Sequence, residues 1–236
     1  RIWLNADVLP EGRYEADAES LFFVEKAAQF LEENRDRRFC LWLSFREPHS
    51  PFNFPIEYAG RYEASEMPLP EVGPGDSRWI PEVFRDLPES DKRGIVAAYY
   101  SSVTYLDSNI GRILEELDRL GLRENTLVVY VGDHGYLLGH HGRFEKHTMW
   151  EPVVRAPLVM RLPDGVGGAE DALVEFVDLV PTILDLLDVE PLPTVQGKSV
   201  AGLLTGELER VHEYVFSEML PDNMARIRDE RFKYVF

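Results

Sequence analysis

The sequence predicts an α/β fold in which a mixed, mostly parallel sheet is flanked by helices, followed by the start of a small antiparallel subdomain. Two short apolar runs, residues 39–45 and 126–131, have the length and continuity of strands that are buried on both faces. Between them, residues 91–120 carry the periodicity of a long amphipathic helix. The order strand, helix, strand, with charged residues at the strand ends, is the α/β pattern.

Three segments have apolar residues at the spacing of a helix. Residues 18–34 and 91–120 repeat them every three or four positions, and Gly121 follows the second segment as the residue expected beyond a helix C-terminus. Residues 178–187 form a third helix in which Asp178 is expected to cap the N-terminus. The long helix is the clearest of the three: its stripe consists of Val96, Tyr99, Val103, Leu106, Ile110, Ile113, Leu117 and Leu120.

The remaining segments read as strands and loops. Residues 157–162 are a further candidate strand, and the prolines of residues 51–90 predict a long loop with at most a short helix. Residues 214–216 and 226–236 read as short antiparallel strands with a turn at Asp229. We therefore place a partial α/β domain at residues 1–205 and the start of the antiparallel subdomain at residues 206–236.

Charge and composition exclude several classes of function. The chain has 236 residues and a net charge of −17, so nucleic acid and anionic lipid would be repelled, and any anion site must gather positive charge locally. No apolar run approaches the roughly 20 residues that span a bilayer. The single cysteine, Cys40, rules out an internal disulfide and is expected to be a buried core thiol.

The tripeptide Asp133-His134-Gly135 follows the strand at residues 126–131. In open α/β sheets ligands bind beyond the carboxyl ends of strands, so a carboxylate and an imidazole released there can both reach one cation. Gly135 lets the backbone turn sharply after them. By itself the tripeptide is also compatible with a simple turn in which the aspartate bonds to its own backbone.

The longer context narrows these alternatives. The run Asp133-His134-Gly135-Tyr136-Leu137-Leu138-Gly139-His140-His141-Gly142, followed by Lys146, resembles the D-H-G-x-x-L-G-x-H-G pattern and lysine of the sulfatases in the alkaline-phosphatase superfamily. Glu151 to Leu158 is similar to that family's E-x-x-x-R-x-P-L segment, and Pro48-His49-Ser50-Pro51-Phe52 is similar to its P-H-x-P-F element. Further similarities keep the family's order over most of residues 14–236.

The resemblance implies a role for each matching position. Asp133 and His134 correspond to ligands of a calcium ion, with magnesium or manganese less favoured; oxygen donors suit calcium and a histidine suits it less. Lys146 corresponds to the lysine that contacts the sulfate and the leaving oxygen, and His49 to the histidine that protonates the leaving group. His147 is expected to line the substrate pocket, and His141 to orient its loop by hydrogen bonding.

The sequence lacks other parts of the family's site. It contains no C/S-x-P-S-R motif, from which sulfatases make their formylglycine nucleophile, and no Asp-Asp metal pair on a first strand. We interpret the chain as a segment without the N-terminal formylglycine region, expected by itself to bind calcium weakly and to hydrolyse nothing.

Three functions stay open at this stage. The first is a calcium-dependent sulfuric-ester hydrolase acting on a small sulfate ester, such as a sulfated sugar or an aryl or alkyl sulfate. The second is a phosphodiester or phosphonate-monoester hydrolase of the same superfamily, and the third is a non-catalytic remnant or interaction module. Aromatic residues in the long loop are expected to pack it rather than to stack on a sugar; they are Phe52, Phe54, Tyr58, Tyr62 and Trp79.

Overall fold

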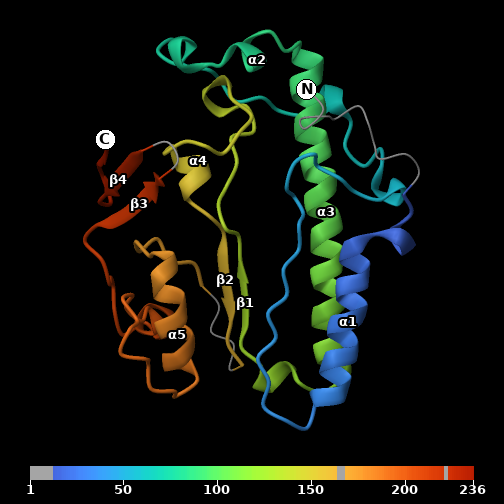
Figure 1. Ribbon diagram of the computed structural model, residues 1–236, viewed down its shortest axis with the longest axis vertical. Helices are drawn as coiled ribbons and strands as arrows, with labels where there is room; N and C mark the ends of the chain where they lie inside the picture. The colour runs from blue at the N-terminus through green and yellow to red at the C-terminus, as the bar shows by residue number, and fades with distance from the viewer. Residues whose placement is uncertain (1–12, 164–167, 221–222) are drawn as a thin grey trace. The chain divides into compact units, whose positions relative to one another are not determined.

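The computed structural model describes residues 13–163, 168–220 and 223–236. The chain divides into two compact units, defined as unit 1 (Arg1–Leu127 and Tyr136–Lys146) and unit 2 (Val128–Gly135 and His147–Phe236). Figure 1 shows the elements of each unit. Each unit is a self-contained body with its own buried residues, so the two are described separately.

Unit 1 is built on two long helices. Helix α1 (Glu19–Asn34) and helix α3 (Glu89–Arg119) lie side by side (Figure 1), which confirms both helices predicted from apolar spacing. Helix α3 ends where Gly121 adopts a left-handed φ of 69°, the conformation expected just beyond a helix C-terminus.

The long loop of unit 1 is largely irregular, as its prolines predict, but it contains four short helical turns where we expected at most one short helix: η3 (Ile56–Tyr58), η4 (Ala64–Glu66), η5 (Ser77–Trp79) and α2 (Glu82–Arg85). Two further turns, η2 (Glu15–Asp17) and η6 (Arg123–Asn125), flank the long helices. Of the five loop aromatics, Phe52 and Tyr58 are buried, whereas Trp79 is 54% exposed. Phe52 packs edge-on against Tyr99 and Tyr136, so these rings mainly fill the loop.

Residues 39–45 differ from their prediction. They run extended but form no β-ladder with any described strand, and their side chains alternate between half-buried and exposed. The prediction that Cys40 is a buried core thiol is wrong, because Cys40 is exposed. Trp42, two residues later, is also 78% exposed. A strand needs neighbours on its edges and faces to bury its side chains, and this segment is covered on one face only.

Unit 2 contains a two-stranded sheet in which β1 (Val128–Val131) pairs antiparallel with β2 (Leu158–Arg161). Both segments were predicted as strands, and no parallel pair of the predicted mixed, mostly parallel sheet occurs among the described residues. Each strand is only partly buried, and Val159 is 59% exposed. Helix α4 (Glu151–Val154) lies on the connection between them, and its Val153 O accepts the Gly135 N–H of the turn after β1.

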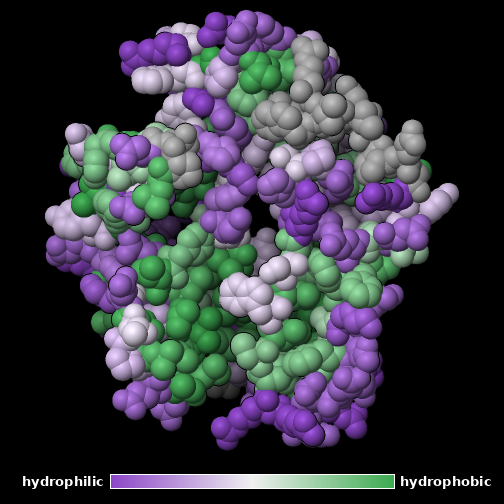
Figure 2. All heavy atoms as spheres, viewed as in Figure 1, coloured by the Kyte–Doolittle hydropathy of each residue, from purple (hydrophilic) through white to green (hydrophobic). Residues whose placement is uncertain are grey.

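The second half of unit 2 begins with η8 (Phe176–Asp178), α5 (Leu179–Leu186) and α6 (Ala201–Thr205). Helix α5 was predicted, but Asp178 does not cap it with its side chain. The buried Asp178 carboxylate instead accepts hydrogen bonds from the Glu175 and Lys198 backbone N–H groups and from His212 Nε2. Figure 2 shows apolar residues gathered on the visible surface around α5.

The C-terminal strands confirm the antiparallel prediction. Strands β3 (Val215–Met219), β4 (Met224–Arg228) and β5 (Lys233–Val235) form a three-stranded antiparallel sheet. Asp229 and the residues after it make the turn between β4 and β5. No helix in the described part of the chain has the length and apolar character needed to cross a bilayer.

Candidate active site

The turn after β1 places Asp133 and His134 next to each other in unit 2. Gly132 N donates to Pro157 O at 3.0 Å, and Gly135 N donates to Val153 O at 2.6 Å, so backbone bonds fix both ends of the turn. A Cβ on Gly135 would lie 2.0 Å from Pro152 O. Only glycine fits there, because the turn passes directly against the backbone of α4.

The Asp133 and His134 side chains of this turn lie close to each other. His134 Nε2 lies 3.5 Å from Asp133 Oδ2, and the Asp133 side chain is 86% exposed. His134 Nδ1 lies 2.8 Å from Gly135 O, so this nitrogen carries the proton and Nε2 keeps its lone pair for a cation. The pair fits a cation but supplies only two donors, and no group of three or more His, Cys, Asp or Glu suited to a metal occurs among the described residues.

His49 belongs to unit 1 and lies on a short loop between residues 45 and 53. Its backbone N–H donates to Arg46 O at 2.8 Å, and its Nδ1 donates to Ser50 O at 2.6 Å. The loop is tied to α1, since Ser20 Oγ donates to Glu47 Oε2 at 2.6 Å, and to α3, since Ser102 Oγ donates to Asn53 O at 3.1 Å. With Nδ1 committed to Ser50, Nε2 is the nitrogen of His49 that can exchange a proton with a substrate.

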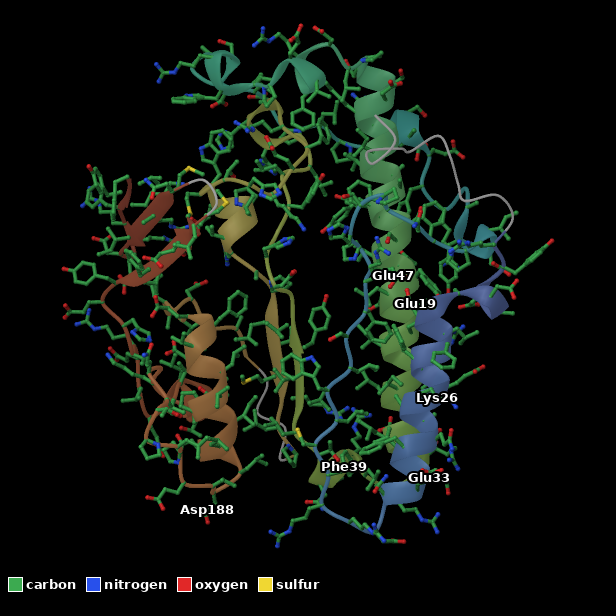
Figure 3. The ribbon with its side chains drawn as sticks, in the orientation of Figure 1. Glu19, Lys26, Glu33, Phe39, Glu47 and Asp188 are labelled. Atoms are coloured by element: carbon green, nitrogen blue, oxygen red, sulfur yellow. The ribbon has the colours of Figure 1, made fainter. Side chains whose placement is uncertain are left out.

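A small cavity of about 100 Å³ lies beside His49 in unit 1. Glu19 and Glu47 line it from the start of α1 and from the His49 loop, and Figure 3 shows these two side chains close together. Tyr105 also lines it: this ring is 1% exposed, and its hydroxyl has no hydrogen-bond partner among the described residues. Burial is the main cause that raises the pKa of Tyr105 above its usual value.

Lys146 ends a compact loop, residues 136–146, that folds back on itself in unit 1. Leu137 N donates to Glu145 O at 2.9 Å, and Tyr136 Oη donates to Phe144 O at 2.7 Å. Leu137 and Phe144 are almost fully buried and anchor the loop in the core. The same burial raises the pKa of Tyr136 far above its usual range.

The long loop of unit 1 holds this lysine loop from outside. The turn η7 (His140–Gly142) contains the expected hydrogen bond of His141, whose Nδ1 lies 3.1 Å from Asp76 Oδ1. This bond is the main cause that lowers the pKa of Asp76 below its usual value. Arg143 pairs with Glu145 and donates to Trp79 O at 2.7 Å. The long loop therefore braces the lysine loop, a role that its composition did not indicate.

The residue Lys146 is half-buried, and among the described residues of unit 1 no carboxylate forms an ion pair with it. An uncompensated, partly desolvated cation is well suited to bind an oxyanion. His147, the next residue, is exposed and belongs to unit 2. The five predicted site residues are thus divided, with His49 and Lys146 in unit 1 and Asp133, His134 and His147 in unit 2.

One group of charged residues was not found from the sequence. In unit 2, Glu151 of α4 pairs with both Arg226 and Arg228 of β4. The signal was available in the alternation Arg226-Ile227-Arg228, because residues two apart on a strand share a face.

A family model and several relatives of known sequence place this chain in the same protein family. The Sulfatase family model matches residues 7–189. The chain is 30% identical to a choline-sulfatase of Rhizobium meliloti over 94% of this chain and 47% of that protein, and 28% identical to a sulfatase of Formosa agariphila over 87% and 43%. A solved phosphonate monoester hydrolase from Silicibacter pomeroyi has a TM-score of 0.83 and 26% identity, covering 95% of this chain and 52% of that one. The chain spans about half the length of the curated relatives that it matches.

Proposed function

Because this chain belongs to the sulfatase family of the alkaline-phosphatase superfamily, we propose that it forms part of the active site of a calcium-dependent sulfuric-ester hydrolase. In this proposal His49 and Lys146 act on the substrate, Asp133 and His134 hold the metal, and His147 lines the substrate pocket. The nucleophile, a formylglycine, comes from residues outside these 236. The observation that carries the proposal is the turn after β1, where a free imidazole Nε2 lies 3.5 Å from an exposed carboxylate oxygen.

Lys146 has the task of neutralising charge on the sulfonyl oxygens. Negative charge grows on these oxygens and on the departing oxygen as the S–O bond breaks, and a fixed ammonium stabilises that charge without reorganising. Its half-buried position strengthens the interaction, since fewer water molecules screen the charge.

His49 has the task of protonating the leaving oxygen. Nδ1 is occupied by Ser50 O, so the protonated ring would donate from Nε2. Glu47, bonded to Ser20, holds the backbone of this loop and therefore the direction of the ring.

Asp133 and His134 would hold the calcium ion, which when bound would supply a divalent charge close to the sulfate group. Two donors are few for calcium, which takes six to eight oxygen ligands in proteins. Further ligands therefore have to come from outside this pair, in keeping with the expected weak calcium binding and the expected inactivity of the 236 residues by themselves.

The proposal is tested in a polypeptide that joins this chain to the nucleophile-bearing residues. We expect His49→Ala to lower kcat/KM for a sulfate ester by about 10²–10⁴-fold, and Lys146→Ala by about 10²–10³-fold. Arg123→Ala, which removes an exposed cation paired with Asp118, is the control and should leave the rate unchanged. Near wild-type rates in both site variants would refute the assigned roles.

A second candidate is a phosphonate-monoester or phosphodiester hydrolase, favoured by the TM-score of 0.83 to the phosphonate monoester hydrolase. Both ester types place charge on oxygens of a tetrahedral centre, so the same lysine and metal would serve either reaction. The ratio of kcat/KM for an aryl sulfate and an aryl phosphonate monoester decides between them. Absence of any hydrolysis in the joined polypeptide would favour the third possibility, a non-catalytic interaction module.

A further inference from the structure

Strands β4 and β5 bring three cations onto one face of the C-terminal sheet. Arg226 and Arg228 are two positions apart on β4 and therefore point to the same face. Lys233 of β5 lies directly opposite Arg228 in the antiparallel register. Like charges directly opposite one another destabilise a sheet, so this arrangement needs a compensating anion.

A single carboxylate compensates this group. Arg226 Nη2 lies 3.2 Å from Glu151 Oε2, and Arg228 Nη1 contacts Glu151 Oε1. The neighbouring carboxylate of Asp229 is committed to the turn, where it accepts the backbone N–H groups of Arg231 and Phe232. Three cations and one carboxylate give this group a net charge of about +2, and Lys233 has no ion-pair partner among the described residues of unit 2, in a chain with a net charge of −17.

Arg226 is the strongest sign of an unfilled interaction. The residue is 3% exposed, and its Nε and Nη1 atoms are buried with no hydrogen-bond partner among the described residues. Burial lowers the pKa of Arg226 below its usual value. Buried donors are normally paired, so a planar guanidinium with two free N–H positions points to a missing acceptor.

The cluster is joined to the proposed metal turn through one short helix of the same unit. Glu151 is the first residue of α4, and Val153 near its other end accepts the Gly135 N–H at 2.6 Å. Four helical residues span about 6 Å. The cluster and the turn that carries Asp133 and His134 therefore both contact α4 within unit 2.

From this arrangement we propose that Arg226, Arg228 and Lys233, arranged around Glu151, form an oxyanion site that binds a second acidic group of the substrate. The site takes a sulfate or carboxylate group, whose planar or tetrahedral oxygens match guanidinium and ammonium donors. This inference rests on the proposed function, because it takes the substrate to be an ester that carries another anionic group, such as an acidic or multiply sulfated sugar.

Sulfate binding to the 236-residue chain tests the site without any need for hydrolysis. Calorimetric titration with sodium sulfate is carried out at constant ionic strength with chloride as the competing anion, in the Lys146→Ala background so that the lysine loop does not contribute. We expect Arg228→Gln and Lys233→Gln each to weaken sulfate binding by about tenfold. Glu151→Gln removes the competing carboxylate and should tighten binding.

Arg231→Gln is the matched control, since it removes an exposed cation from the same hairpin and should change the affinity less than about twofold. Lys233 is exposed, so Lys233→Gln keeps the test valid if a change at Arg228 impairs folding; circular dichroism checks each variant. Sulfate affinity that is absent, or equal in all variants, overturns the site.

Whether the site binds a free anion or an acidic group of a substrate is decided by comparing the affinities of inorganic sulfate and of sulfated sugars for the 236-residue chain. Glucosamine 2,6-disulfate should bind more tightly than glucosamine 6-sulfate, and Lys233→Gln should remove the difference. Equal binding of inorganic sulfate and the disulfate would assign the site to a free anion and overturn the substrate assignment. Because these are binding measurements, loss of hydrolysis in the joined polypeptide would count against the proposed function and leave the oxyanion site intact.

Discussion

The loop that carries Lys146 and the turn that carries Asp133 and His134 are held in place by different forces. The lysine loop is anchored by buried side chains, Leu137 and Phe144, and braced by the hydrogen bond from His141 to Asp76. The metal turn has no buried anchor of its own; backbone hydrogen bonds and the absence of a side chain at Gly135 fix it against α4. The position of the lysine loop therefore depends on side-chain packing in the core, whereas the position of the metal turn depends on close contact between its backbone and that of α4.

The largest expected effect is on the lysine loop. Phe144 is 1% exposed and packs against Phe84, so Phe144→Ala should lower the free energy of unfolding by about 3–5 kcal/mol. Phe22→Ala, at a ring that is 52% exposed, is the matched control and should cost less than about 1 kcal/mol. Urea unfolding measures both, and equal losses would show that Phe144 does not anchor the loop.

The corresponding change in the metal turn is Gly135→Ala. Its methyl group would meet Pro152 O at 2.0 Å, so the turn has to move, at a cost of about 2–4 kcal/mol. Gly111 lies inside α3 with no atom within 4 Å of an added Cβ, so Gly111→Ala should raise stability by up to about 1 kcal/mol. Opposite signs in the two alanine variants would confirm that backbone fit holds the turn.

Calcium binding probes how much of a metal site the turn supplies. With two donors, the 236-residue chain should bind calcium with a dissociation constant of about 10⁻³ M or weaker. Asp133→Asn should weaken binding further, while Asp76→Asn, which alters a carboxylate of the long loop in unit 1, should leave it unchanged. Tight binding that survives Asp133→Asn would place the calcium site elsewhere.

The smallest expected effect is the pH response of the brace on the lysine loop. The hydrogen bond from His141 lowers the pKa of Asp76 below its ordinary 3.8, so the stabilisation is complete above that pH and is lost as the pH falls through the lowered value. Wild type should therefore lose more thermal stability than Asp76→Asn when the pH is taken from 5 to about 2.5. Parallel curves would show that the pair contributes nothing.

Local patterns predicted the elements of this fold well. Helices α1, α3 and α5 and strands β1 and β2 follow from apolar spacing over neighbouring residues, and Gly121 follows from the need for a left-handed residue after α3. The motif around Asp133 predicted the adjacency of carboxylate and imidazole, because neighbouring residues in a tight turn cannot separate. The Sulfatase family model matches residues 7–189, which confirms the family resemblance drawn from the sequence motifs.

Pairing between distant segments was predicted less well. Residues 39–45 have the composition of a buried strand but form no ladder with a described strand, and the described strands pair antiparallel where we expected a mixed, mostly parallel sheet. Composition records a preference for extended backbone, whereas pairing and burial depend on which other segments lie alongside.

The sequence by itself determined the family, the helices, the positions of β1 and β2 along the chain and the turn that joins a carboxylate to an imidazole, because these depend on residues close together in the chain. Only the tertiary structure decided that Asp76 braces the lysine loop and that Glu151 faces Arg226 and Arg228, partners 65, 75 and 77 residues apart. Such contacts are set by the packing of whole elements, which no local pattern of residues encodes.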